Sequence, residues 1–321
     1  MTAPATAMTV RVAQRRVEAE DVCSFELVST DGSELPAFDA GAHLDVLTPA
    51  GQLRQYSLAN APVERHRYLI GVLREADSRG GSLSMHLQLR VGDRLPVSLP
   101  RNHFALAPAA PFSLLLAGGI GLTPLLAMAE ALHASGQAFA LHVCVRSRTR
   151  LAFSDRLVGS AWADSVHLHI DDETGRPDLT ALLAGAPAGA HAYVCGPGGF
   201  LDAVREHARM ADWDDARVHF EYFSHELAPA DHSGAFDVRI HSSGQVIHVE
   251  MDQTIVQALA ANGVTVLTSC EQGVCGTCLT RVLEGVPEHR DAYLTAQEQA
   301  ANDQCLPCCA RAKTPLLVLD L

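Results

Sequence analysis

The segment SCEQGVCGTC, residues 269–278, constrains the fold of this chain more than any other part of the sequence. Its cysteines have the spacing Cys270-x4-Cys275-x2-Cys278, which is typical of a two-iron, two-sulfur cluster. Thiolates are soft ligands that suit iron–sulfur clusters. Gly273 and Gly276 allow the loop to bend tightly, so that backbone N–H groups can approach the sulfurs. The loop therefore predicts a 2Fe-2S cluster that is held by these three cysteines and one further ligand.

The fourth ligand has to come from a later part of the chain. The candidates are Cys305, Cys308 and Cys309 in QCLPCCARAK, and composition does not choose among them. A structural zinc site is the alternative, because Cys305-x2-Cys308 could act as a second C-x2-C pair. Only one such pair lies in the loop itself, so the spacing favours a cluster over zinc and over inert cysteines.

Length and charge set the broad class of the protein. A chain of 321 residues is long for one hydrophobic core, so two or three domains are expected. The net charge of −13 argues against nucleic-acid binding. The longest apolar stretch, residues 112–132, contains three glycines and a proline, which predicts strand–loop–helix instead of a membrane span. Nine cysteines without a visible secretory signal favour a reducing compartment, the cytoplasm.

The pattern of apolar residues changes along the chain and predicts three domains. Residues 1–108 show short strands separated by Gly, Pro and Asp, which indicates an antiparallel barrel or sandwich. Residues 109–226 alternate strands with helices, which is typical of a parallel α/β sheet. A polar segment, 227–235, is the expected linker. Residues 236–321 begin with a hairpin and a short helix, and then carry the cysteine loop.

Two glycine-rich loops follow strands of the predicted α/β domain. LLLAGGIGLTPLL carries Gly119 and Gly121 between a strand and a helix, where free N–H groups suit a phosphate. It is not a G-x-G-x-x-G motif, so alone it indicates a tight turn as readily as a dinucleotide site. YVCGPGGF carries Cys195, Gly196 and Pro197 after a later strand. Ligands of parallel sheets bind at the carboxyl ends of strands, so the two loops together predict a cofactor cleft. A buried structural cysteine is the alternative for Cys195.

The first domain carries a possible phosphate cradle. LRQYSLAN contains Arg54, Gln55, Tyr56 and Ser57 on a predicted strand. SRGGSLSMHL contains Arg79, Gly80, Gly81 and Ser82 before a helical turn, where an arginine and a helix start could bind phosphate. Taken singly, these residues also fit a surface arginine, a core tyrosine and a turn.

The order of these motifs resembles one family. R-x-Y-S, G-G-S, G-G-I-G-x-T-P, C-G-P and the cysteine pattern, in this order over about residues 8–321, are similar to the phthalate dioxygenase reductase family. The resemblance implies an FMN-binding β-barrel, a nicotinamide-binding α/β domain and a C-terminal β-grasp ferredoxin domain. It also implies that NADH reduces FMN and that a 2Fe-2S cluster passes single electrons to a Rieske non-haem iron oxygenase component. The alternative is an iron–sulfur flavoprotein carrier or sensor that serves no oxygenase.

The resemblance also implies roles for individual residues. Thr123 and Cys195 would be the catalytic pair, with Thr123 near both the flavin and the nicotinamide and Cys195 beside the nicotinamide ring. Cys308, which stands in a C-x-x-R setting before Arg311, would be the fourth cluster ligand. The other implied cofactor contacts are Arg54, Gln55, Tyr56, Ser57, Val72, Leu73, Arg79, Gly80, Gly81, Ser82, Gly119, Gly121, Arg146, Gly196, Pro197 and Phe223.

The choice of nicotinamide and of flavin follows from the same resemblance. The family default is NADH. The segment VRSRTR, residues 145–150, contains three arginines where a 2′-phosphate would lie, which leaves NADPH open. FMN is expected over FAD, because no extra segment is available for an adenosine half.

Overall fold

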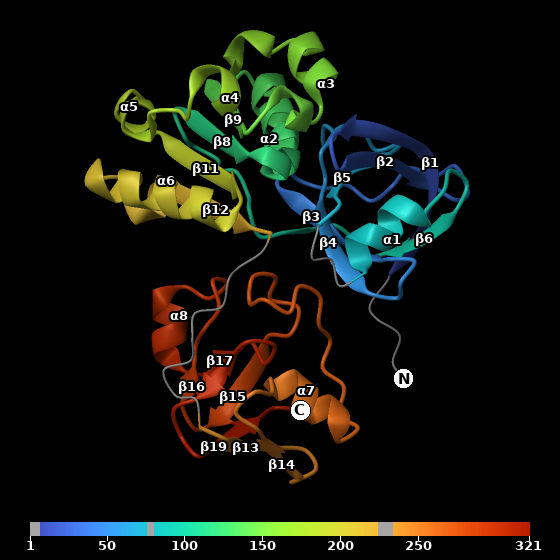
Figure 1. The fold of residues 1–321 in the computed structure, drawn as a ribbon, viewed down its shortest axis with the longest axis vertical. Coiled ribbons are helices and arrows are strands. Elements are labelled where there is room, and N and C mark those ends of the chain that lie inside the picture. Colours follow the sequence, from blue (N-terminus) through green and yellow to red (C-terminus); the bar gives the residue numbers. More distant parts are fainter. Residues whose placement is uncertain (1–6, 76–79, 224–233) are drawn as a thin grey trace. The chain divides into compact units, whose positions relative to one another are not determined.

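The computed structural model describes residues 7–75, 80–223 and 234–321 (Figure 1). The chain divides after Phe223 into two compact units. Within the described ranges, no helix is long and apolar enough to cross a membrane. The predicted domain boundaries stay predictions, and most of the expected linker, 227–235, lies outside the described residues.

The first part of the first unit is an antiparallel β-barrel. Its strands follow the order β4-β3-β6-β1-β2-β5, and an isolated bridge between Leu58 and Ile70 joins the two ends of the sheet. Alternate side chains such as Val10, Phe25 and Leu44 fill the interior. This confirms the predicted antiparallel barrel. The elements are β1 (Met8–Ala19), β2 (Val22–Ser29), β3 (Ala42–Leu47), β4 (Leu53–Ser57), β5 (Tyr68–Leu73), α1 (Gly81–Leu87), β6 (Arg94–Val97) and β7 (Arg101–Asn102).

The second part of this unit is a parallel sheet between two layers of helices. The strand order is β10-β9-β8-β11-β12, and every pair is parallel. This confirms the predicted α/β fold. The elements are β8 (Ser113–Gly118), η1 (Gly119–Gly121), α2 (Leu122–Ala134), β9 (Phe139–Val145), η2 (Arg148–Arg150), α3 (Ser154–Gly159), η3 (Ala163–Ser165), β10 (Val166–Ile170), α4 (Asp171–Thr174), α5 (Leu179–Ala184), β11 (His191–Gly196), α6 (Gly198–Met210), η4 (Asp215–Arg217) and β12 (Val218–Tyr222).

Buried strands explain the apolar runs of the parallel sheet. Leu115 and Ala117 of β8 pack with α2 on one face, whereas Leu116 of the same strand packs with α5 and α6 on the other. Figure 1 shows α2 and α6 on opposite sides of β8 and β11. Ala59 and Phe104 of the barrel region belong to the same hydrophobic cluster as α2. The barrel and the sheet therefore form one compact unit, which fixes the position of β4 and β5 relative to α2.

The second unit is a mixed sheet of the β-grasp type. Its strand order is β14-β13-β19-β15-β17, with β13 and β19 parallel and the other pairs antiparallel. Helix α7 begins with a capping box between Thr254 and Gln257 and packs its Leu259 into the core. The predicted hairpin and helix are confirmed. The elements are β13 (Phe236–Ile240), β14 (Val246–Val249), α7 (Ile255–Ala261), β15 (Thr280–Glu284), β16 (Pro287–Glu288), α8 (Ala296–Ala301), β17 (Gln304–Cys305), β18 (Arg311–Ala312) and β19 (Leu316–Leu319).

Candidate functional site

The arginine of R-x-Y-S and the glycine turn of G-G-S meet in the barrel. Arg54 is on β4, and Gly81 begins α1. A Cβ on Gly81 would lie 2.8 Å from Nε of Arg54, so the absence of a side chain permits this contact. Gly80 has φ +104, a conformation that favours glycine. The glycine turn and the Arg54 guanidinium therefore contact each other at the start of α1. Arg79 lies outside the described residues.

Tyr56 provides a test of whether the barrel suits a flavin. Its hydroxyl is buried and has no hydrogen-bond partner among the residues that the structure describes. Burial raises the pKa of this phenol, so it is a neutral donor. A buried polar group without a partner is costly. A flavin on this strand would offer acceptor atoms to the hydroxyl and an apolar ring to the tyrosine face, so the residues fit the group.

The two glycine loops lie against each other at the carboxyl ends of β8 and β11. A Cβ on Gly121 would be 2.2 Å from the carbonyl oxygen of Cys195, and one on Gly196 would be 2.9 Å from Cα of Gly118. The loops can meet only because these positions lack side chains. The predicted cofactor residues Gly119, Gly121, Cys195, Gly196 and Pro197 are therefore brought together.

Thr123 connects the two glycine loops to the barrel. The residue is 1% exposed, and its hydroxyl donates to the carbonyl oxygen of Ile120 at 3.0 Å. A Cβ on Gly71 of β5 would lie 2.7 Å from the Thr123 methyl group. Thr123 therefore packs against Gly71, the residue that precedes Val72 and Leu73 on β5.

Two side chains from separate strands converge on the carboxylate of Glu221, which lies on a third strand. The Ser57 hydroxyl of β4 donates to Oε2 of Glu221 at 3.3 Å, and the Cys195 thiol of β11 approaches the same oxygen at 3.9 Å. Although Glu221 as a whole residue is only half-buried, desolvation of its carboxyl raises its pKa to about 8, and the two hydrogen bonds partly offset this. Burial also raises the pKa of the Cys195 thiol, so this thiol is neutral.

Glu221 is a candidate site residue that the sequence motifs did not indicate. It stands in FEYF at the end of β12, directly beside Cys195 in the strand register. A charged residue at the carboxyl end of an apolar parallel strand was the available signal.

We expect Glu221→Gln to change how stability depends on pH. The folded carboxyl holds its proton up to about pH 8, whereas the carboxyl of the unfolded chain loses it near the ordinary glutamate pKa of 4.5. The folded state therefore binds more protons in this window, and stability falls as pH rises through it. The variant lacks this fall, which amounts to a few kcal/mol in order of magnitude. Thermal unfolding midpoints between pH 5 and 9 measure the effect, with the exposed Glu206→Gln as control. Parallel curves for Glu221→Gln and the parent protein would rule out a buried, protonated Glu221.

The remaining predicted cofactor contacts, Arg146 and Phe223, lie farther from these loops. Arg146 is exposed at the end of β9, one strand beyond β8. Phe223 follows β12 and packs against the hydrophobic cluster that contains α2. Of the neighbouring arginines, Arg148 makes two bonds to Glu173, at 2.8 and 2.6 Å, and Arg150 pairs with Glu20 at 3.3 Å. Two of the three guanidinium groups in this segment are therefore engaged by carboxylates.

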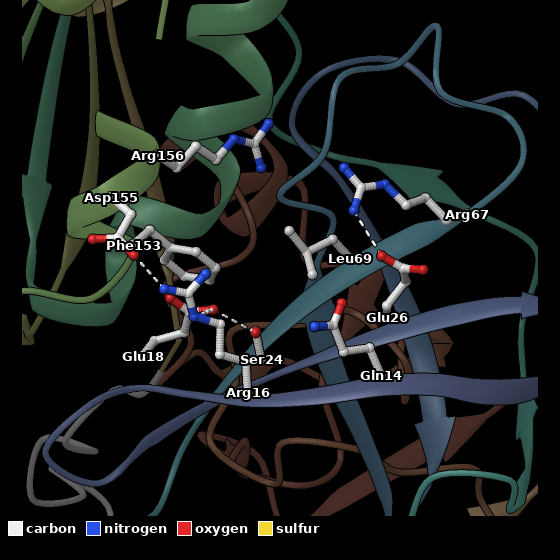
Figure 2. Close-up of a pocket in the computed structure, with 10 residues that line it drawn as sticks. All are labelled: Gln14, Arg16, Glu18, Ser24, Glu26, Arg67, Leu69, Phe153, Asp155 and Arg156. Atoms are coloured by element: carbon white, nitrogen blue, oxygen red, sulfur yellow. Dashed lines mark hydrogen bonds and ion pairs between the residues drawn. The ribbon is translucent and has the colours of Figure 1, made fainter. Parts of the chain in front are cut away.

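A pocket of about 160 Å³ lies where the barrel meets α3, but none of the predicted cofactor residues lines it (Figure 2). Its charged groups pair with one another: Arg16 with Asp155, Arg67 with Glu26, and the Ser24 hydroxyl with Glu18. Arg156 pairs with Glu130 and donates to the carbonyl oxygen of Ala59. The contacts of Arg16 with Asp155 and of Arg156 with Ala59 join the barrel to the α/β part of the unit. Because the charged groups of the pocket are paired, few of them are available to bind a ligand.

The cysteine loop of the second unit presents its thiols in neighbouring pairs. Cys270 and Cys275 lie within hydrogen-bonding distance of each other. Cys278 and Cys308 belong to one buried cluster of side chains. Gly273 and Gly276 both have positive φ, near +70°, which confirms that the loop needs glycine at these turns. Each iron of a 2Fe-2S cluster takes two thiolates, so a paired arrangement of four cysteines fits this group.

The three later cysteines have different surroundings. Cys305 lies on β17, paired with Thr280 of β15, and belongs to the sheet core. Cys308 and Cys309 pack beside Cys278 instead. The Cys309 thiol donates to the carbonyl oxygen of Leu306 at 3.6 Å. The Cys309 thiol also lies within hydrogen-bonding distance of the Cys308 thiol, and a Cβ on Gly273 would be 2.6 Å from the sulfur of Cys309. Packing therefore sets Cys305 apart from the other two, and Cys308 as the fourth ligand stays a prediction of the resemblance.

Comparisons with known proteins agree with this arrangement. Residues 238–313 match the family model described as a 2Fe-2S iron-sulfur cluster binding domain. The chain is 54% identical to a vanillate O-demethylase oxidoreductase of Pseudomonas putida, over 97% of this chain and 98% of the relative. It is 40% identical to a phthalate 4,5-dioxygenase oxygenase reductase subunit of Pseudomonas putida, over 94% and 93% of the two chains.

A solved structure extends the agreement to the whole fold. Phthalate dioxygenase reductase, described as a modular structure for electron transfer from pyridine nucleotides to [2Fe-2S], is 38% identical to this chain. The match covers 98% of both chains with a TM-score of 0.76. Motif order, architecture and identity over nearly the full length agree, and the chain therefore belongs to the phthalate dioxygenase reductase family of iron–sulfur oxidoreductases.

Proposed function

We propose that this chain is the reductase component of a Rieske non-haem iron oxygenase system, oxidising NADH by way of FMN and passing single electrons through its 2Fe-2S cluster to the oxygenase. The observation that carries the proposal is the convergence of Ser57, from the barrel, and Cys195, from the parallel sheet, on one carboxylate oxygen of Glu221. This contact supports a flavin site and a nicotinamide site that would adjoin each other. A chain that also carries a cluster-binding unit has the parts of an electron-transfer reductase.

A flavin accepts one hydride, which carries two electrons, and releases these electrons one at a time, which matches a two-electron donor to a one-electron cluster. Arg79, Gly81 and Ser82 would hold the flavin phosphate, as the resemblance implies. Arg54, which lies beside Gly81, would line the flavin, and Tyr56 would lie against the ring. Thr123 and Cys195 would position the nicotinamide over the flavin. Because Cys195 is neutral and fully buried, it acts by packing and weak hydrogen bonding and not as a nucleophile. Ser57 and Glu221 would orient the same ring.

The choice of NADH has electrostatic support. Carboxylates already engage Arg148 and Arg150. Asp171 and Asp172 begin α4, and the Asp172 N–H donates to the carbonyl oxygen of Arg146. These negative charges would repel the 2′-phosphate of NADPH at the end of β9. FMN is proposed because no described segment extends the barrel toward an adenosine half. The remaining contacts are proposed as the resemblance implies them, including Cys308 as the fourth cluster ligand.

The partner follows from the chemistry of the cluster and from the relatives. Clusters of this type have reduction potentials of roughly −400 mV, low enough to reduce a Rieske centre at about −150 mV or above. The vanillate and phthalate relatives bear the names of aromatic-acid systems, so an oxygenase of aromatic catabolism is the proposed acceptor, in the cytoplasm. The contact is expected to be small and transient.

The visible spectrum of the purified protein, before and after anaerobic NADH, tests the proposal. We expect a flavin band over a broad brown absorbance, and both should bleach with NADH. Acid extraction identifies the flavin as FMN or FAD by mass. A yellow protein that lacks iron and sulfide, even after anaerobic reconstitution, would remove the cluster. A spectrum that NADPH bleaches much faster than NADH would reverse the choice of nicotinamide.

A further inference from the structure

A buried carboxylate lies directly behind the cysteine loop. A Cβ on Gly273, between Cys270 and Cys275, would be 2.9 Å from both Cα and Cβ of Asp291. The N–H of the next residue, Ala292, donates to the carbonyl oxygen of Gly273 at 3.0 Å. Asp291 is therefore held against the loop that carries three of the four cluster ligands.

Asp291 and its neighbour His289 are almost completely removed from solvent. Their side chains are 0% and 8% exposed, and Nδ1 of His289 is 3.6 Å from Oδ1 of Asp291. The other carboxylate oxygen, Oδ2, accepts a hydrogen bond from the N–H of Leu294 at 2.8 Å. Across the described part of the chain, Oδ1 of Asp291 and both ring nitrogens of His289 lack a hydrogen-bond partner. A separation of 3.6 Å is too long for a hydrogen bond.

Burying these two polar side chains costs folding free energy, and their interactions stabilise little of the local structure. Buried polar groups are normally satisfied, and each exception requires an explanation. One oxygen of Asp291 caps the Leu294 N–H, but this bond needs no histidine beside it. The charge of Asp291 also reaches the segment of the later cysteines: burial, and next the field of this carboxylate, raises the pKa of Cys305 to about 12.

We propose that Asp291 and His289 are positioning residues that set the reduction potential of the 2Fe-2S cluster, the carboxylate lowering it and the imidazole opposing that effect. The potential of such clusters depends on net charge, hydrogen bonding and exposure to solvent. A charge in the protein interior is poorly screened, so a carboxylate behind the loop makes it harder to add an electron to the cluster. Nδ1 of His289 faces Oδ1 of Asp291, and an N–H on this nitrogen would weaken that field. The inference rests on the cluster of the proposed function and deepens it.

A redox titration of the full-length protein, followed by the electron paramagnetic resonance signal of the reduced cluster, tests this role. Asp291→Asn keeps the shape and the acceptor for Leu294 but removes the charge. We expect it to raise the midpoint potential by about 59 mV, which corresponds to about a tenfold change in the one-electron equilibrium constant. His289→Leu should lower the potential, and because neither ring nitrogen is hydrogen-bonded among the described residues, it breaks no bond. Asp320→Asn, an exposed carboxylate in the same unit, is the matched control and should leave the potential unchanged.

Iron and sulfide analysis of each variant separates this inference from the proposed function. Unchanged potentials in Asp291→Asn and His289→Leu, with full iron and sulfide, would overturn the inference and leave the reductase intact. A shift of the midpoint potential in the same direction in both variants would also overturn the inference. If Asp291→Asn assembles no cluster, an unchanged potential in His289→Leu alone overturns the inference. Absence of a cluster from the parent protein itself would instead overturn the proposed function.

Discussion

Cys308→Ser is expected to abolish the iron–sulfur cluster, whereas Cys305→Ser and Cys309→Ser should retain it. Cys308 packs beside Cys278 in a buried cluster of side chains. Cys305 instead fills the sheet core from β17, and the thiol of Cys309 is bonded to Leu306 in its own turn. A serine hydroxyl is a hard ligand that replaces thiolate poorly at iron. The loss should be complete, because three thiolates leave one iron without its second cysteine.

Iron and sulfide content, with the visible spectrum, measures this loss directly. Cys308→Ser should keep its flavin band and its reduction of a dye by NADH, because the first unit is untouched. Its reduction of cytochrome c should fall to the level of protein without a cluster. Full iron and sulfide in Cys308→Ser would exclude Cys308 as the fourth ligand, and loss of the cluster in Cys309→Ser would then assign that ligand to Cys309. The two neighbouring serine variants are matched controls for each other.

The parts of this protein that could be predicted from the sequence are those with short-range signals. The spacing of Cys270, Cys275 and Cys278 lies within nine residues and needs no knowledge of the fold. The alternation of strands and helices from β8 to β11 is equally local, because each buried strand forms a continuous apolar run. The family comparisons confirm the recognition that combined these motifs in order.

Other features depend on which strands become neighbours, and periodicity does not contain this information. Glu221 meets Cys195 only because β12 pairs with β11 in a register that places them side by side. Arg148 and Arg150 looked available for a phosphate, but Glu173 and Glu20 approach them from distant parts of the chain. Asp291 likewise gains its place behind the cluster loop from the close approach to Gly273. Side-chain pairing of this kind requires tertiary structure.

Gly121→Ala should slow flavin reduction by NADH about 100-fold without loss of flavin. The new Cβ would lie 2.2 Å from the carbonyl oxygen of Cys195 and 2.6 Å from the N of Gly196, whereas Cβ contacts essentially never fall below 3.0 Å. Both are backbone atoms, so no side chain can rotate away, and the two loops must separate. Displacing reacting groups by about 1 Å can cost ~10²-fold in rate. Gly121 has φ −60°, so alanine adds no strain of its own.

Stopped-flow measurement of flavin reduction decides the matter, with Gly198→Ala as the matched control. Gly198 begins α6 in the same C-G-P loop, and a Cβ there would meet nothing within 4 Å. The control should therefore stay within about twofold of the parent, as ordinary surface substitutions do. A Gly121→Ala protein that is reduced at the parent rate would show that the loops do not jointly position the nicotinamide. Equal slowing in both variants would show that the effect comes from loop flexibility and not from the approach of Gly121 to Cys195.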